Sequence, residues 1–213
     1  MTSHQIGEIT LSLSTIVYFL WFIPQILLNY QRKSTRGLSL WMHGLLFVGY
    51  TADLLYGFGR HMQWQYRLVT VVGLMFLFVE HVQFFYYGCK RKAELYNFVG
   101  FTFFIALLLL YAVMNFTFFH HSKKYYDIAG FVSALCWMTY LLPQLIKNFK
   151  LKSTRGLSIG FVAFSVCLSF LDITSTVALR WDWPSMMSEG ITLLKKSLLV
   201  FQMIYYKKGS SLN

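Results

Sequence analysis

A sixteen-residue stretch occurs twice in this chain, and it constrains the fold more than any other feature. Residues 24–39 read PQILLNYQRKSTRGLS, and residues 143–158 read PQLIKNFKLKSTRGLS. Ten of the sixteen positions are identical at a constant offset of 119, whereas ordinary residue frequencies give about one chance match. An internal repeat of this kind predicts that a whole structural unit is duplicated.

The composition is that of a membrane protein. Of the 213 residues, 56% are hydrophobic and only 13% are charged, against roughly 25% charged residues in a soluble domain. Apolar runs approach about 20 residues, the length at which a helix crosses the roughly 30 Å bilayer core. We therefore predict an all-α membrane fold with seven transmembrane helices, at residues 7–30, 39–59, 67–88, 95–118, 126–149, 157–179 and 185–206.

The offset of 119 divides these seven helices into three, one and three. Residues 7–90 form the first three-helix repeat, 91–125 the connector helix and 126–208 the second repeat, within a single membrane domain that occupies residues 1–213. A single connecting helix gives both repeats the same orientation in the membrane. We expect two parallel three-helix bundles related by an axis along the membrane normal, an arrangement described for transporters.

The net charge of +11 is explained by topology and by anionic lipid headgroups, and no nucleic-acid partner is expected. Twelve basic residues fall in the loops on one side of the predicted helices and five on the other. The side with twelve is predicted to be cytosolic. This places the N-terminus in the lumen or outside the cell and the C-terminus in the cytosol.

A Pro-Gln pair begins each copy of the repeat, inside a predicted span. Proline removes a backbone donor and disrupts its helix. One such proline is ordinary in membrane helices, but two matched pairs, Pro24-Gln25 and Pro143-Gln144, favour a hinge or gate. The loop glycines that follow, expected to allow the tight turn into the next helix, are Gly37 and Gly156.

Two acidic residues inside the predicted spans are mates in the repeat. Asp53 matches Asp172 at the offset of 119. A charge at the bilayer centre costs about 2.5–3.5 kcal/mol on insertion scales, so such residues face the interior of a bundle. The pair is predicted to bind protons or a substrate amine in a shared cavity. The alternative is that each carboxylate only accepts structural hydrogen bonds.

Further polar residues in the spans break or follow the repeat. Glu80 has no acidic mate, and we expect it to pair with Lys195 or Lys196 across the central axis, either as a structural ion pair or as a site for an amino-acid zwitterion. Gln83 and Gln202 are mates and are expected to line the cavity. All five are candidates for proton or substrate binding.

The sequence offers little for enzymatic chemistry. His43 and His81 lie in spans and are either proton shuttles or hydrogen-bonded structural residues. No CxxC pair, nucleophile elbow, P-loop or HExxH motif is present. We therefore expect no enzyme activity, no metal and no cofactor.

The doubled Pro-Gln, each followed by a basic loop and Gly-Leu-Ser, resembles the PQ-loop repeat family. That family includes cystinosin-like and lysosomal cationic amino-acid exporters and is related in fold to the SWEET sugar transporters. The resemblance implies that Pro24, Gln25, Pro143 and Gln144 act as hinges of alternating access and that a substrate cavity lies between the bundles. It also implies a lysosomal or other endomembrane location in a eukaryote, or the cytoplasmic membrane in a bacterium.

Three functions are compatible with these features. The first is a proton-coupled secondary transporter of a small polar metabolite, with an amino acid, cationic or neutral, as the expected substrate. The second is a SWEET-like sugar uniporter, which does not need acids in the membrane. The third is a peptide-binding sorting receptor similar to the KDEL receptors, in which Lys195 and Lys196 hold a carboxylate.

Overall fold

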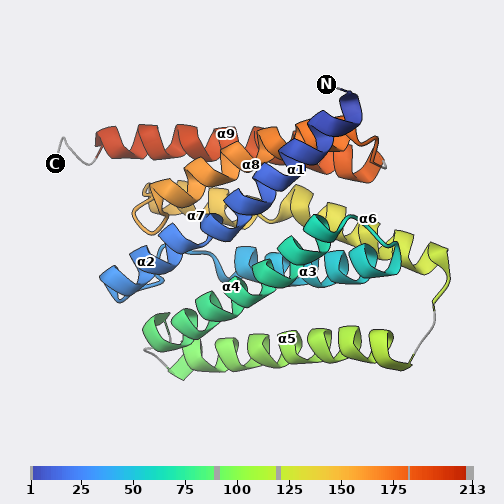
Figure 1. Cartoon of the computed structure of the whole chain (residues 1–213). Helices are drawn as coiled ribbons and strands as arrows, with labels where there is room; N and C mark the ends of the chain where they lie inside the picture. The colour runs from blue at the N-terminus through green and yellow to red at the C-terminus, as the bar shows by residue number, and fades with distance from the viewer. Residues whose placement is uncertain (1, 89–91, 119–120, 182, 210–213) are drawn as a thin grey trace.

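The computed structural model describes residues 2–88, 92–118, 121–181 and 183–209, and this part of the chain is helical without any strand, as predicted (Figure 1). The helices form seven rods, and two of the rods are broken into two segments. The segments in chain order are α1 (Ser3–Trp21), α2 (Ile23–Arg32), α3 (Leu40–Gly59), α4 (Trp64–Gly88), α5 (Lys92–Phe118), α6 (Lys123–Thr139), α7 (Leu142–Leu151), α8 (Ile159–Ala178) and α9 (Trp183–Gly209).

The rods match the seven predicted spans, with ends that differ by a few residues. Five of them are long and apolar enough to cross a membrane, counted over the described residues. The other two, α3 and α9, are 20 and 27 residues long, and α9 carries three charges in its first half. The chain is thus a multi-pass membrane protein.

The two broken rods are those with a Pro-Gln pair, and the break precedes the proline. Helix α1 ends at Trp21, and Pro24 lies in the first turn of α2. Helix α6 ends at Thr139, and Pro143 lies in the first turn of α7. The first turn is where a missing N–H costs least, so each proline begins a new segment and does not simply kink a continuous helix.

A lysine, and not the glycine of the repeat, makes the tight turn at the end of each short segment. Lys33 (φ 48°) and Lys152 (φ 46°) adopt the left-handed conformation, and neither glycine has a positive φ. The next N–H bonds back to a carbonyl five residues earlier, Ser34 to Asn29 at 3.3 Å, as in a Schellman motif. The repeat glycines lie in the following turn, residues 35–38 and 154–157, which leads into the next helix as expected and is closed in each copy by an N–H to carbonyl bond of 3.0 Å.

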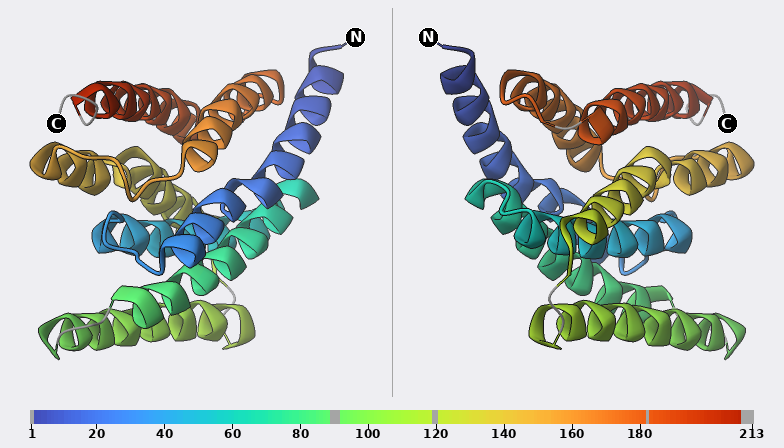
Figure 2. Two further views of the ribbon diagram at one scale, coloured as in Figure 1. Left: turned by 90° about the vertical axis from the view of Figure 1, so that its left-hand side faces the viewer. Right: turned by 90° about the vertical axis from the view of Figure 1, so that its right-hand side faces the viewer.

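The two repeats pack in the same way. In each repeat the third rod contacts both the first and the second, because α4 packs on α1 and α3 while α9 packs on α6 and α8. Between repeats, the first rod of one packs along the second rod of the other, as α1·α8 and α3·α6 (Figure 2). The connector α5 lies at the edge of the molecule against α3 and α4 (Figure 1).

The core is centred on the residues at the two helix breaks. Trp21 and Phe22 at the first break, and Tyr140 and Leu141 at the second, are each 1% exposed. These pairs are mates at the offset of 119, and Trp21 stacks on Phe161 with ring centroids 5.2 Å apart. The residues at both breaks therefore belong to one hydrophobic core, to which both repeats contribute.

The orientation in the membrane remains a prediction. Both broken ends, α2 and α7, lie at the same end of the molecule as the C-terminus, and the N-terminus lies at the opposite end (Figure 1). Of the twelve basic residues assigned to the cytosolic side, Lys90 and Arg91 lie outside the described residues. The repeat boundaries at 7–90, 91–125 and 126–208 likewise stay a prediction.

Candidate functional site

A cavity of about 450 Å³ lies between the two repeats. Its outer part is lined by residues at helix ends, Arg60, Lys123 and Trp181, at the end opposite to α2 and α7. We call this the mouth. Its inner part is lined by Tyr50 and Trp137, whose rings pack edge to face with centroids 5.0 Å apart.

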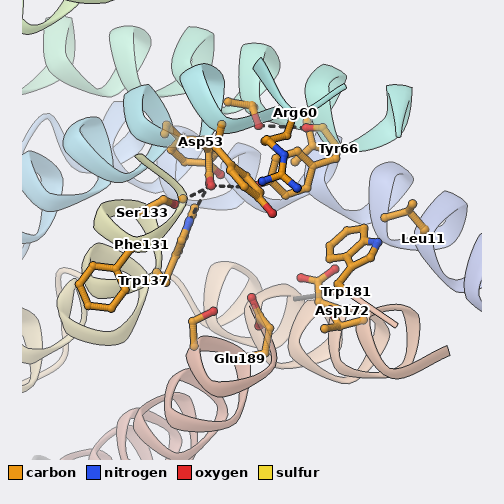
Figure 3. Close-up of a pocket in the computed structure, with 18 of the residues that line it drawn as sticks. Leu11, Asp53, Arg60, Tyr66, Phe131, Ser133, Trp137, Asp172, Trp181 and Glu189 are labelled. Carbon is orange, nitrogen blue, oxygen red and sulfur yellow. Dashed lines mark hydrogen bonds between the residues drawn. The ribbon is translucent and has the colours of Figure 1, made fainter. Parts of the chain in front are cut away.

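Asp53 and Asp172 both line this cavity (Figure 3). Each lies on the second rod of its own repeat and accepts hydrogen bonds from the first rod of the other repeat. Asp53 on α3 accepts from Ser133 Oγ (2.5 Å) and Trp137 Nε1 (2.7 Å) on α6.

The second aspartate repeats this pattern. Asp172 on α8 accepts from Ser14 Oγ (2.5 Å) and Tyr18 OH (2.9 Å) on α1. Ser14 is the mate of Ser133, and Tyr18 is the mate of Trp137, at the offset of 119. Two equivalent carboxylates therefore tie the repeats together on opposite walls of the cavity.

The symmetry ends at Tyr66, whose hydroxyl donates a third hydrogen bond to Asp53. Asp172 receives two described side-chain hydrogen bonds where Asp53 receives three, although both are nearly buried, at 8% and 7% exposed. A carboxylate has about four acceptor positions. Asp172 thus keeps more capacity for a ligand or a proton than Asp53 does.

Glu189 is a third carboxylate on the cavity wall, and the sequence analysis missed it (Figure 3). It lies on α9, and its mate in the first repeat is Thr70, which also lines the cavity. Its strongest electrostatic partners are Asp172 and Lys196. The sequence could have indicated Glu189, because it is an acidic residue inside the span predicted at 185–206. It lies near the start of that span, however, where a charge is easily assigned to the membrane surface.

Lys195 and Lys196 do not pair with Glu80, so that expectation was wrong. Lys195 donates to the carbonyl oxygens of Trp137 and Met138 at the end of α6. These carbonyls lose their helical partners at the break before Pro143, so Lys195 caps the helix. A cation is favourable at a helix C-terminus.

Lys196 lies one residue further along α9 and behind the cavity wall. It donates to Ser169 Oγ at 2.7 Å, and its ammonium lies 6.0 Å from the ring centroid of Trp21. Glu189 and Asp172 are the carboxylates that act on its charge. Lys196 therefore balances part of the negative charge of the cavity.

Glu80 lies outside the cavity, between α3, α4 and α5. Its titratable partner is His43, with Nδ1 and Oε2 3.6 Å apart. Both side chains are buried, at 3% and 1% exposed. Glu80 lies on α4, which packs on α1, α3 and α5, whereas Lys195 and Lys196 lie on α9, which packs on α6, α7 and α8.

The Pro-Gln glutamines close the end opposite to the mouth by reaching across to the other repeat. Gln25 Nε2 donates to Gly156 O at 3.0 Å, and its Oε1 accepts from Ser158 N at 2.8 Å. The mate does the same in return: Gln144 Nε2 donates to Gly37 O (2.9 Å) and Oε1 accepts from Ser39 N (2.8 Å). We call these four hydrogen bonds the clasp.

Close backbone contact explains the glycines of the repeat. A Cβ atom on Gly37 would overlap the Cα of Gly156, and the reverse holds for Gly156. The two loops touch at these positions, and no larger residue fits without moving them apart. The glycines thus allow the clasp to form.

Gln83 and Gln202 support the clasp and do not line the described cavity, so that expectation was wrong. Gln83 Oε1 accepts from Asn29 at 2.9 Å, and Asn29 in turn accepts from Gln25. In the second repeat, Asn148 accepts a hydrogen bond from Gln144 and donates one to Gln202. Each chain of hydrogen bonds fastens a short Pro-Gln segment to the third rod of its own repeat.

A seven-rod membrane protein built from two parallel repeats, with a cavity open at one end and a glutamine clasp at the other, defines the class of this chain. The model of the PQ loop repeat matches it twice, at residues 6–66 and 125–185. The matches cover more than half of the sequence, and the chain belongs to the PQ-loop repeat family.

Two curated proteins are similar in sequence. The vacuolar lysine transporter YPQ1 of Saccharomyces cerevisiae is 34% identical over 90 residues, covering 39% of this chain and 29% of the relative. Cystinosin of Drosophila melanogaster is 24% identical over 221 residues, covering 89% of this chain and 56% of the relative. The chain thus spans about a third of one relative and about half of the other.

A solved structure of a eukaryotic SWEET transporter has the same fold. It superposes with a TM-score of 0.69 at 15% identity, over 95% of this chain and 99% of that structure. This confirms the predicted fold class of two three-helix repeats and a connector.

Proposed function

We propose that this protein is a secondary transporter of a small polar metabolite, that the metabolite is an amino acid, and that transport is coupled to protons. The observation that carries the proposal is the convergence of three carboxylates, Asp53, Asp172 and Glu189, on one cavity between the two repeats. Each costs energy to keep in a membrane. The packing of the repeats alone does not require all three, because the mate of Glu189 is a threonine.

The size and charge of the cavity suit an amine-bearing metabolite. A volume of about 450 Å³ lies in the range of small-molecule sites, about 300–1,000 Å³. Four carboxylates line it against two basic side chains, and one of each is already paired as Arg60 with Asp127 at the mouth. The remaining excess of negative charge attracts a cationic group.

The relatives support transport of such a substrate. YPQ1 is a vacuolar lysine transporter by name, and lysine carries the cationic amine that this cavity would bind. The vacuolar relative also supports an endomembrane location if the host is a eukaryote. The predicted orientation then places the mouth in the lumen and the clasp in the cytosol.

Alternating access follows from the clasp. With the four hydrogen bonds made, the cavity is reached from the mouth alone. Opening the clasp and closing the mouth would expose it on the other side, by rocking the repeats about the breaks at Pro24 and Pro143. Protonation of Asp172 during this cycle is the proposed coupling step, because it removes the negative charge that Tyr18 and Ser14 stabilise.

The other two functions find less support in the described residues. A sugar uniporter has no use for three carboxylates on the cavity wall. The peptide-receptor hypothesis assigned the ligand carboxylate to Lys195 and Lys196, but Lys195 caps α6 and Lys196 donates to Ser169. Neither lysine lines the cavity.

Thermal-shift screening of the purified protein tests the substrate class. We expect cationic amino acids to raise the melting temperature, since a ligand at 100 times its Kd adds about 2.7 kcal/mol of stability. Asp172→Asn should lose the shift, and Gln65→Asn, outside the cavity, should keep it. Stabilisation by sugars or by a C-terminal tetrapeptide, with none by amino acids, would contradict the proposal.

A further inference from the structure

Three titratable residues in the first repeat have purely apolar mates in the second. His43, Glu80 and His81 correspond at the offset of 119 to Val162, Leu199 and Val200. Val162 and Leu199 are as buried as the residues that they match, at 2% and 0% exposed. The second repeat shows that this position in the fold is stable when filled with aliphatic side chains alone.

The three residues form one cluster between α3, α4 and α5. His43 Nδ1 lies 3.6 Å from Glu80 Oε2, inside ion-pair distance but beyond hydrogen-bond length. The rings of His43 and His81 stack with centroids 5.6 Å apart and planes 5° apart. None of the three residues lines the cavity.

The hydrogen bonds around His81 fix the tautomer of its neutral ring. Thr102 on the connector α5 donates its hydroxyl proton to Phe98 O at 2.9 Å, so its oxygen accepts from His81 Nε2, also at 2.9 Å. The other ring nitrogen, Nδ1, is then an acceptor. It is buried and has no hydrogen-bond partner among the described residues, and the same is true of Glu80 Oε1 and both nitrogens of His43.

Burying polar atoms without hydrogen-bond partners costs free energy. A proton shared between the His43 ring and the Glu80 carboxylate would lower this cost. With one proton the His43–Glu80 pair is neutral. A second proton makes the cluster positive, and removal of the first leaves a buried carboxylate without a donor. The aromatic rings of Phe84, Phe98 and Phe101 surround the two histidines.

Few other charges face the cluster. Tyr50 on α3 is a titratable group that interacts with Glu80, and His43 and His81 interact with each other. Helix α5 contributes the hydroxyl of Thr102 and aromatic rings. Burial is the main influence on the protonation of Glu80 and His43, and the two groups lie within ion-pair distance of each other.

The cluster is one helical turn from the clasp on both of the helices that carry it. His43 N–H bonds to Ser39 O at 3.2 Å, and Ser39 N–H is held by Gln144 of the other repeat. Glu80 precedes Gln83 by three residues on the same face of α4. A change in the distance between α3 and α4 at the cluster would therefore move Ser39, which takes part in the clasp, and Gln83, which supports it.

We propose that His43, Glu80 and His81 form an internal proton-binding site, separate from the substrate cavity, and that its proton occupancy biases the clasp between closed and open. The proton-sensitive element lies in the first repeat only, whereas the clasp is symmetric. This site does not depend on the identity of the substrate or on Asp53 and Asp172.

Infrared difference spectra between acidic and neutral buffer test proton binding. We expect a carboxylic-acid carbonyl band that disappears in Glu80→Gln and remains in Asp53→Asn. Glu80→Gln keeps the shape and polarity of the side chain, so it should fold. If Glu80→Gln leaves every carbonyl band in place, the proton-binding site does not exist.

Spin labels on Gln31 and Lys150 test the link to the clasp. These residues are mates at the exposed ends of α2 and α7. The distance between the labels is measured by double electron–electron resonance, without substrate and in a background free of native cysteines. It shows whether the clasp is closed or open. The wild-type distribution should change with pH. The variant His43→Val/Glu80→Leu/His81→Val, which copies the second repeat, should melt at least as high as the wild type and lose the pH response.

A cavity variant separates this proposal from the proposed function. Asp53→Asn/Asp172→Asn should abolish transport and still show the pH-dependent change in label distance. If that variant loses the pH response and the triple variant keeps it, the sensor lies in the cavity and the inference is overturned. A wild-type distribution that is constant with pH overturns it as well.

Discussion

Removing the glutamine clasp should shift the protein toward the state in which the cavity opens at the end of α2 and α7. Gln25→Leu deletes two hydrogen bonds to the other repeat, those with Gly156 O and Ser158 N. Leucine has nearly the volume of glutamine, so packing is retained. The bond from Gln25 to Asn29 lies within one segment, and its loss affects both states alike.

The size of the shift follows from the number of bonds. A net contribution of about 1 kcal/mol for each hydrogen bond gives about 2 kcal/mol for one glutamine, since only the clasped state contains the two bonds. The ratio of open to closed molecules should then rise about 30-fold, because about 1.4 kcal/mol is a factor of ten. The double variant Gln25→Leu/Gln144→Leu should raise it about 1,000-fold.

Spin labels on Gln31 and Lys150 give the measurement. The wild type at neutral pH should show one short distance, the single variant a mixture, and the double variant mainly a longer distance. Gln65→Leu, at the far end of α4 and outside the clasp, is the matched control and should resemble the wild type. The reasoning fails if the double variant has the wild-type distribution while remaining folded.

Four further changes have defined outcomes. Gly37→Ala should open the clasp in the same label assay, because its Cβ overlaps the facing loop, whereas Gly100→Ala, with nothing within 4 Å, should not. Asp172→Asn should lower uptake at least tenfold and make the residual uptake insensitive to collapse of the pH gradient, since asparagine copies the protonated carboxyl; residual uptake that still follows the gradient would refute this. Glu189→Gln should raise KM for a cationic amino acid more than for a neutral one in competition uptake. Lys195→Met should lower the melting temperature by an amount equal to about 1–3 kcal/mol, because it removes the side-chain donor to the Met138 carbonyl at the end of α6; an unchanged melting temperature would remove its role as a cap.

The fold could be predicted from the sequence because two strong signals agreed. Apolar runs gave the positions of the rods, and the offset of 119 gave their grouping. The same offset paired Asp53 with Asp172, and the structure places both on one cavity. The mates Ser14 and Ser133 were equally visible in the sequence, but nothing there shows that each reaches the aspartate of the other repeat.

Contacts between repeats are the part that the sequence analysis missed. Gln25 and Gln144 were assigned to a hinge, and the structure shows that they bond to the opposite loop. Lys195 was expected to neutralise a carboxylate, but a lysine can also donate to carbonyl oxygens freed by a helix break. The sequence shows that a charge lies in the span, but it does not show which of these two roles the lysine has. Glu189 was missed because the end of a span is poorly defined by hydropathy.

Uptake of radiolabelled amino acids into proteoliposomes tests the central claim most directly. With the mouth side acidic, the wild type should accumulate a cationic amino acid, and collapse of the pH gradient should slow accumulation. Asp53→Asn/Asp172→Asn should bring uptake to the level of empty liposomes while the protein still melts cooperatively. Uptake of sugars alone, or amino-acid uptake that the double variant leaves unchanged, would contradict the account.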